Sequence, residues 1–362
     1  MKLRTLLPLL LTALTVNTAT YTTADAASNG ARNKDGSIVT GVLTAVFDPN
    51  AGLDGVPIPN NLFYLGTTDL TLNAPTDGLD GTAAALVEQI NALDGFSTTE
   101  RWTTTFVDDD RNPGAIDPDS VVPGQSVRVF QVTTQQFVAV TGIIRELTPG
   151  VDYTAAASGN VLAIVPLQPL DEYSSYMAVL TNDINDAAGN DATPDQTYFL
   201  TKRAEPWVDE NGQSTYPLID DATAQALAQL QPLTASMEAA AASAGINPED
   251  IILSWTVQTQ SITPVLGLLR STVQPADVQL VGPLGNTSDF GLPGTADYYI
   301  GAIEVPYYLG VPSAENPVAP LTDFWTAEPG AYLPPFDQLG LDPTSTNITL
   351  ANPFPVVTSV ET

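Results

Sequence analysis

Apolar and polar positions alternate through the middle of the chain. Between Arg101 and Asp195, residues 127–132 place valines among polar neighbours, and residues 161–165 and 176–180 form short apolar runs. β-Branched and aromatic residues in such runs are typical of strands. Turn sequences separate the stretches at Pro149-Gly150, Ser158-Gly159-Asn160 and Ala188-Gly189-Asn190.

Strands this short and closely spaced favour an antiparallel sandwich. A parallel sheet would need helical crossovers between its strands. Residues 251–259 return to alternation, with Trp255 and Val257 on one side. We therefore expect an immunoglobulin-like antiparallel β-sandwich over residues 101–261, interrupted by an insertion at about 203–248, in a fold that is mainly β with some α.

Helical periodicity appears first in residues 82–93, where Leu86, Ile90 and Leu93 share one predicted face. In the insertion, residues 222–231 form a second predicted helix, with Asp221 as its N-cap. Pro232 should break or kink this helix. Gly245 and Pro248 should end the segment that follows, so the insertion is predicted to be a helical hairpin.

The last hundred residues carry little periodicity. Residues 263–269 predict a short apolar helix, and residues 298–309 form one strand within sequence rich in proline, glycine and asparagine. We expect this strand to expose an apolar face, because unpaired apolar edges usually mark interfaces. The outline is a signal peptide at 1–26, an irregular segment with one short helix at 27–100, the sandwich at 101–261 and a connecting segment at 262–362.

The chain begins like an exported protein. Lys2 and Arg4 precede an apolar stretch at residues 6–16, and Ala24-Asp25-Ala26 offers a cleavage site, so the mature chain is expected to start near Ala27. The alternative is a membrane anchor, but this stretch is too short to cross roughly 30 Å of hydrocarbon. We expect a secreted protein, extracellular or on the outer surface, that passes through the periplasm and has no transmembrane segment.

Charge limits the partners. The formal net charge is −30 at pH 7. Such a field repels phosphates, so nucleic acid and anionic lipid headgroups are not expected partners. The chain has no cysteine, which excludes disulfides and a lipid-anchored N-terminus.

Residues needed for common hydrolytic chemistry are missing. The chain has no histidine, so it cannot assemble a Ser-His-Asp or Cys-His arrangement. No G-x-S-x-G pentapeptide occurs, and Gly124-Gln125-Ser126-Val127-Arg128 lacks the second glycine that the strained elbow requires. We predict no catalytic residues and no cofactor-binding residues in this chain, which should be inactive alone.

Two acidic loops offer oxygen ligands of the kind that calcium prefers. The calcium candidates are Asp108, Asp110, Asp117, Asp119, Asp183, Asp186 and Asp191. Neither loop follows a known calcium-binding spacing, and simple solvation of acidic loops is the alternative. The four tryptophans and Tyr298, Tyr299, Tyr307 and Tyr308 are open to two interpretations, a binding platform or core packing.

Several segments together resemble the N-terminal region of bacterial virulence-factor lipases, an extracellular family. Each segment is weak alone, and their order along the chain gives the match its specificity. They are Phe47-Asp48-Pro49, Ile58-Pro59-Asn60-Asn61-Leu62-Phe63, Leu93-Asp94-Gly95-Phe96-Ser97-Thr98-Thr99, Ser126-Val127-Arg128-Val129-Phe130, Trp255-Thr256-Val257-Gln258-Thr259-Gln260-Ser261 and Pro306-Tyr307-Tyr308-Leu309-Gly310-Val311-Pro312. Residues 116–190 also resemble a bacterial immunoglobulin-like domain.

The resemblance implies a partner in the same polypeptide. In this family an α/β-hydrolase domain, with the serine elbow and the catalytic histidine, follows the N-terminal region. No residue here matches that catalytic motif, so none is carried over. The expected function is the non-catalytic N-terminal region of a secreted lipase, supporting or presenting the hydrolase domain and contacting lipid or a cell-surface component. The alternative is a stand-alone secreted module that binds or adheres to a cell surface.

Overall fold

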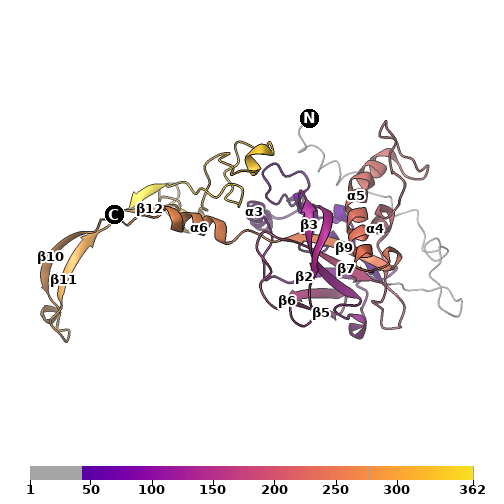
Figure 1. Ribbon diagram of the computed structural model, residues 1–362, viewed down its shortest axis with the longest axis horizontal. Coiled ribbons are helices and arrows are strands. Elements are labelled where there is room, and N and C mark those ends of the chain that lie inside the picture. The colour runs from indigo at the N-terminus through magenta and orange to yellow at the C-terminus, as the bar shows by residue number, and fades with distance from the viewer. Residues whose placement is uncertain (1–42, 276, 362) are drawn as a thin grey trace. The chain divides into compact units, whose positions relative to one another are not determined.

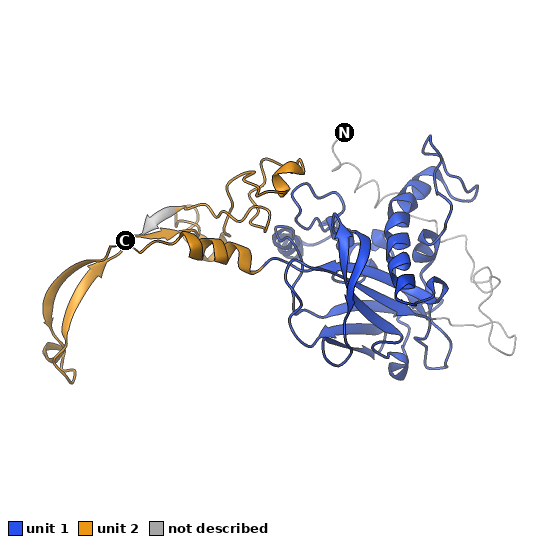
Figure 2. Ribbon diagram, viewed as in Figure 1, with its two compact units in different colours: residues 1–261 blue, residues 262–362 orange. Residues whose placement is uncertain are grey.

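The computed structural model describes residues 43–275 and 277–361 and divides the chain into two compact units, residues 1–261 and 262–362 (Figure 2). The predicted signal peptide and cleavage site lie outside the described residues. No helix in the described ranges is both long enough and apolar enough to cross a membrane.

Unit 1 is built around two β-sheets (Figure 1). Its strands are β1 (Thr44–Ala45), β2 (Trp102–Val107), β3 (Val127–Gln135), β4 (Ala139–Glu146), β5 (Tyr153–Ser158), β6 (Val161–Pro166), β7 (Ser175–Thr181), β8 (Thr193–Pro194) and β9 (Ile251–Gln258). Its α-helices are α3 (Gly81–Ile90), α4 (Gln196–Thr201) and α5 (Asp221–Ser243). Short 3₁₀ turns lie at Pro49–Gly55, Asn61–Tyr64, Pro118–Ser120 and Pro248–Asp250.

The two sheets pack face to face as a sandwich. One has the order β5-β6-β2-β1-β8 and the other β4-β3-β7-β9; all pairs are antiparallel except the short pair β1 and β8. Trp102 on β2 meets Tyr176 on β7 with 6.3 Å between ring centroids, so side chains of the two sheets interlock in the core. The predicted mainly β fold with some α is confirmed; its immunoglobulin-like character stays a prediction.

Strands β7 and β9 are buried along their whole length, because both of their faces are covered. One face lies against the other sheet. Helices α4 and α5 cover the outer face, where the Tyr198 hydroxyl and the Ser254 Oγ lie 2.7 Å apart (Figure 1). This double cover explains why the central part of β7 and the first residues of β9 are continuous apolar runs, and why the polar residues Ser254, Thr256 and Gln258 of β9 are buried as well.

The predicted helical hairpin in the insertion is wrong. Residues 221–243 form the single helix α5, and Pro232 lies inside it. Leu227 and Leu230 before the proline and Met237 after it are all buried. The buried side chains on both sides of Pro232 thus offset the loss of the backbone hydrogen bond that a proline cannot donate.

The ends of α5 are close to those expected. The N-cap is Asp220 rather than Asp221, and its Oδ1 accepts a hydrogen bond of 2.9 Å from the Thr223 N–H. Gly245 follows the helix with a φ of 81°, a left-handed conformation that costs glycine little.

Helix α3 lies where a helix was predicted, but its buried face differs. Val87 is buried and Ile90 packs against the same core, whereas Leu86 and Leu93 are exposed. The helix contacts the core mainly through Val87 and Ile90, so the spacing of apolar residues alone predicted the wrong buried face.

Unit 2 contains α6 (Thr263–Thr272), β10 (Gln279–Asn286), a 3₁₀ turn at Thr287–Phe290, β11 (Asp297–Ala302), β12 (Val305–Tyr307), α7 (Ala319–Thr322), a 3₁₀ turn at Phe336–Gln338 and β13 (Ser359–Glu361). Strands β10 and β11 form one two-stranded sheet, and β12 and β13 form another. The predicted strand at residues 298–309 is therefore two strands, β11 and β12, with Ile303 and Glu304 between them. Residue 302 ends the pairing with β10, and residue 305 begins the pairing with β13.

Candidate functional site

The two acidic loops, which follow strands β2 and β7, contact each other. The loop at 108–119 is tied to the loop at 183–195, because the Asp117 N–H donates to the Asn185 carbonyl at 2.8 Å and the Asn185 N–H donates to Ser120 Oγ at 2.9 Å. The residues 116 and 186 also form an antiparallel bridge. The two loops predicted from the sequence are therefore neighbours in space.

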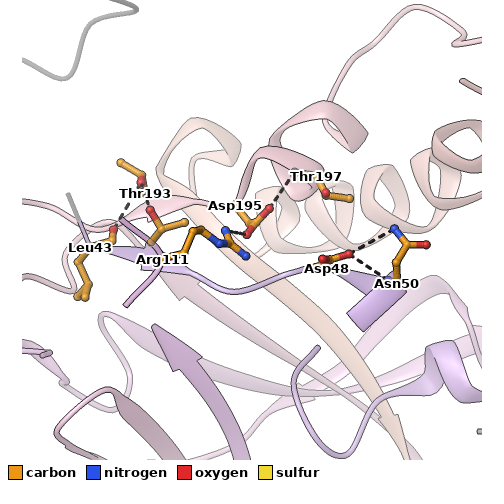
Figure 3. Close-up of polar contacts among 8 residues, drawn as sticks. Leu43, Asp48, Asn50, Arg111, Thr193, Asp195 and Thr197 are labelled. Atoms are coloured by element: carbon orange, nitrogen blue, oxygen red, sulfur yellow. Dashed lines mark hydrogen bonds and ion pairs between the residues drawn. The ribbon is translucent and has the colours of Figure 1, made fainter. Parts of the chain in front are cut away.

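An ion pair between Arg111 and Asp195 joins these loops to helix α4 (Figure 3). Arg111 Nη1 lies 2.7 Å from Asp195 Oδ2; the Asp195 side chain is 5% exposed and the Arg111 side chain 54%. The other carboxylate oxygen of Asp195 accepts from the Thr197 N–H at 3.1 Å and so caps α4. Arg111 was not singled out in the sequence, because 84 positions separate it from Asp195.

The calcium candidates mostly hold their own loops. Asp108 accepts from the N–H groups of residues 110 and 112, and Asp117 caps a short 3₁₀ turn by accepting from the Asp119 N–H. Asp186 accepts from the N–H groups of residues 188 and 190, at 2.8 and 2.9 Å. These bonds are typical of Asx turns.

The remaining candidates have fewer contacts. Asp183 accepts from Thr181 Oγ1 at 3.2 Å, and Asp191 accepts from the side chain of Asn185 at 3.0 Å. Across residues 43–275 and 277–361, no group of three or more acidic side chains is placed to hold a metal ion. Calcium binding stays a prediction, which titration calorimetry with calcium chloride tests directly.

The half-buried ammonium group of Lys202 fastens the end of helix α4 to the sandwich and to α5. Lys202 Nζ donates to the carbonyls of Pro248 and Ile251, at 2.6 and 2.8 Å, and lies 3.0 Å from Glu238 Oε1 on α5. Burial raises the pKa of Glu238 above its ordinary value, and Lys202 opposes that rise. Two backbone carbonyls and one carboxylate surround the ammonium group, so Lys202 acts as a structural clamp here.

Two of the segments that carry the family resemblance meet at the end of unit 1. The Phe96 N–H donates to the Gln258 carbonyl, and the Gln260 N–H donates to the Phe96 carbonyl, both at 2.8 Å. The Asp94 carboxylate accepts from the Ser261 N–H at 2.9 Å and from Ser261 Oγ at 2.6 Å. Asp94 is buried, so this carboxylate fixes the last residue before unit 2.

A cavity beside strand β9 is small. Its volume is about 20 Å³, and residues from the 3₁₀ turn at 61–64, from α5 and from β9 line it. That volume suits one or two water molecules rather than an acyl chain. Trp102, Trp207 and Trp255 are buried in unit 1, which supports the packing interpretation for these three aromatics.

Most of the exposed large apolar side chains of the described residues belong to unit 2. Among the unit 2 residues whose burial the structure describes, the buried apolar residues are all small, namely Ala319, Ala327, Ala351 and Pro353. The predicted exposure of the strand region is confirmed at Tyr299, Ile300, Ile303 and Val305, whereas Tyr298 and residues 307–309 are half-buried.

Comparison with known proteins agrees with this picture. The family model described as bacterial virulence factor lipase N-terminal matches residues 89–277, just over half of the chain. A search of curated proteins found no match. The matched residues run from the end of α3 through the sandwich to the segment after α6. The chain belongs to the family of bacterial virulence-factor lipase N-terminal regions.

Proposed function

We propose that this chain is the non-catalytic N-terminal region of a secreted bacterial lipase, and that unit 2 packs against the lipase domain linked to it. One observation carries the proposal. Unit 2 has helices and strands, but both clusters of buried apolar side chains in the described chain consist of unit 1 residues.

Ordered backbone without a core is costly. Fixing each residue loses conformational entropy, about 1–2 kcal/mol for the backbone, and burial of apolar surface normally offsets that loss. In the described part of unit 2, large apolar side chains such as Leu280, Ile300 and Phe324 are more than 60% exposed. A linked domain that covers these side chains would supply the missing burial.

The amino-acid composition is consistent with a supporting role for this chain and a catalytic role for the linked domain. A chain without histidine cannot supply the base of a serine hydrolase triad, so the linked domain must supply the chemistry. Unit 1 has its own core and a Lys202 clamp that fixes its helices, so it suits the role of a rigid support. Secretion follows in this proposal from the export signal, and N-terminal sequencing of the mature protein should begin near Ala27.

Limited proteolysis tests the proposal. The chain alone is compared with the same chain joined to its lipase domain, using a protease that cleaves beside apolar residues. We expect cleavage within residues 262–361 of the chain alone and resistance of this region in the joined protein. Unit 1 serves as the internal control and should resist equally in both. Equal cleavage of unit 2 in both samples would refute the proposal.

The second candidate is a stand-alone surface module. The self-contained core of unit 1 favours it, because such a sandwich does not need a partner to fold. Reading the DNA downstream of residue 362 separates the two candidates. A frame that continues into a serine elbow and a histidine supports the lipase, and an unrelated gene supports the module.

A further inference from the structure

The β10–β11 hairpin is the most exposed apolar element of unit 2. Its two strands pair with each other only, and no third strand lies beside them among the described residues (Figure 1). A lone two-stranded sheet is at best marginally stable in water, so it needs further strands or a packing layer.

Both faces of the hairpin are apolar. Val281 lies opposite Ile300 in the ladder, so these two side chains share one face, and they are 63% and 61% exposed. Leu280 lies opposite Gly301, one residue along, so it belongs to the other face together with Tyr299. Leu280 is 64% and Tyr299 51% exposed.

Gly301 gives the second face its shape. A Cβ atom at this position would lie 2.7 Å from Leu280 Cδ2, so the leucine side chain lies across the glycine. At the turn end, Phe290 meets Tyr298 edge to face, with 5.1 Å between ring centroids. The apolar side chains therefore continue from the strands to the turn.

Charge selects among the possible occupants. Asp289 and Asp297 are the charged residues of segment 278–303, and Arg270 is the one basic residue of residues 262–362. An anionic membrane would repel this segment. A second copy would bring the same excess of acidic residues, since the net charge of the chain is −30.

Geometry favours a slot over a flat surface. A sheet that docks on a flat surface buries one face and keeps polar residues on the other, whereas strands that are apolar on both faces are typical of positions covered on both sides. An uncharged apolar slot in a folded domain covers both faces. The linked lipase domain is the candidate that family membership supplies.

We infer that the β10–β11 hairpin inserts into an apolar slot of the linked lipase domain and buries both of its faces there. This inference rests on the proposed function, because it names the element of unit 2 that makes the contact. It also predicts that the two faces contribute separately to docking.

Amide hydrogen exchange tests the inference. The chain alone is compared with the same chain joined to its lipase domain. We expect the amides of β10 and β11 to exchange about tenfold or more slowly in the joined protein. If residues 305–361 become protected but the hairpin does not, the proposed function stands and the inference fails. If no part of unit 2 becomes protected, the proposed function fails as well.

Face-specific variants of the joined protein give the sharper test. The pair V281D and I300D charges one face, and the pair L280D and Y299D charges the other. We expect each pair to restore fast exchange in the hairpin. The control is L321D, because Leu321 is an 87% exposed leucine of unit 2 outside the hairpin, and it should leave the exchange unchanged. Restoration by one pair only would overturn two-sided insertion.

Two measurements on the chain alone address the other occupants. Vesicles of neutral phosphatidylcholine should not slow exchange in the hairpin, and neither should raising the chain concentration. Protection by vesicles would assign the hairpin to a lipid surface, and protection that rises with concentration would assign it to a second copy. Either result would overturn the inference.

Discussion

Two leucines, one in each unit, allow the contribution of side-chain burial to stability to be compared between the units. Leu180 lies on β7, inside the sandwich, and is 0% exposed, whereas Leu280 lies on β10 and is 64% exposed. Leu180→Ala removes a fully buried side chain from a packed core, which costs about 2–5 kcal/mol. Full burial of a leucine contributes about 1.5–3 kcal/mol, so Leu280, buried over about a third of its surface, contributes about 0.5–1 kcal/mol.

Urea unfolding of the chain alone, followed by tryptophan fluorescence, is the assay. Trp102, Trp207 and Trp255 are buried in unit 1, so the main transition reports on the sandwich. With a slope of about 3 kcal/mol per molar urea, Leu180→Ala should lower the midpoint by about 1 M. Leu280→Ala should leave that midpoint unchanged. A comparable shift from Leu280→Ala would show that unit 2 contributes buried surface to the sandwich, and the reasoning about its missing core would be refuted.

Four further outcomes are expected. Arg111→Ala leaves the buried Asp195 carboxylate without its cation and should cost about 1–2 kcal/mol of unfolding free energy. The control is Arg101→Ala, because Arg101 is exposed, and it should change the unfolding free energy by no more than about 0.5 kcal/mol. Equal costs for the two variants would count against a role for the ion pair. Burial raises the pKa of Glu238 in the folded chain, so the contribution of this group to stability is fully present below its ordinary pKa of 4.5 and is lost as the pH rises through its pKa in the folded chain. Glu238→Gln should therefore weaken the fall in unfolding free energy above pH 4.5. Identical pH profiles for the variant and the natural chain would contradict this. The pH dependence has the opposite sign for Asp152, whose pKa is lowered by hydrogen bonds from the Thr148 N–H and from Arg145 and Gln168. Asp152→Asn should therefore destabilise the chain above pH 3.8, and its difference in unfolding free energy from the natural chain should vanish as the pH falls through the lowered pKa. Denaturation at a series of pH values measures this difference. The purified chain should hydrolyse no p-nitrophenyl ester in a manner blocked by a serine-directed phosphonate, since it lacks histidine; phosphonate-sensitive turnover would refute the assignment of the chemistry to the linked domain.

The sandwich was predictable where burial and strand propensity agree. Strands β7 and β9 combine apolar runs with β-branched and aromatic residues, so the sequence identifies them. Strand β5 contains Ala155, Ala156 and Ala157, and alanine is uncommon in strands. Strand β4 lies at a sheet edge and mixes exposed polar residues with Ile143 and Ile144. These two strands depend on their neighbours, which local patterns do not encode.

The hairpin in unit 2 shows a second limit. Gly282 and Pro283 indicate a turn, yet they lie within β10, where the ladder with β11 has an irregularity. A local irregularity of this kind lets glycine and proline remain inside a strand. The apolar character of residues 298–303 was visible in the sequence, but its strand partner was not.

Contacts between distant charges could not be read from the sequence at all. Arg111 and Asp195 are 84 positions apart, and Lys202 meets Glu238 only because α4 and α5 pack together. The acidic loops were identified as clusters from composition. Their joining through residues 117, 120 and 185 is a consequence of the fold.

The Asp94 clamp on Ser261 has a mechanical consequence. The chain passes from unit 1 to unit 2 directly after Ser261, so a force exerted on unit 2, for instance by a linked domain that folds or binds, is transmitted along the backbone to Ser261. There it is shared between two hydrogen bonds to one buried carboxylate before it reaches the ladder between β9 and β7. Weakening this anchor, as Asp94→Ala would, should let the end of β9 peel away at a lower force in single-molecule pulling. The buried Asp94 carboxylate at the boundary between the units thus protects the edge strand β9 from being pulled out of its sheet.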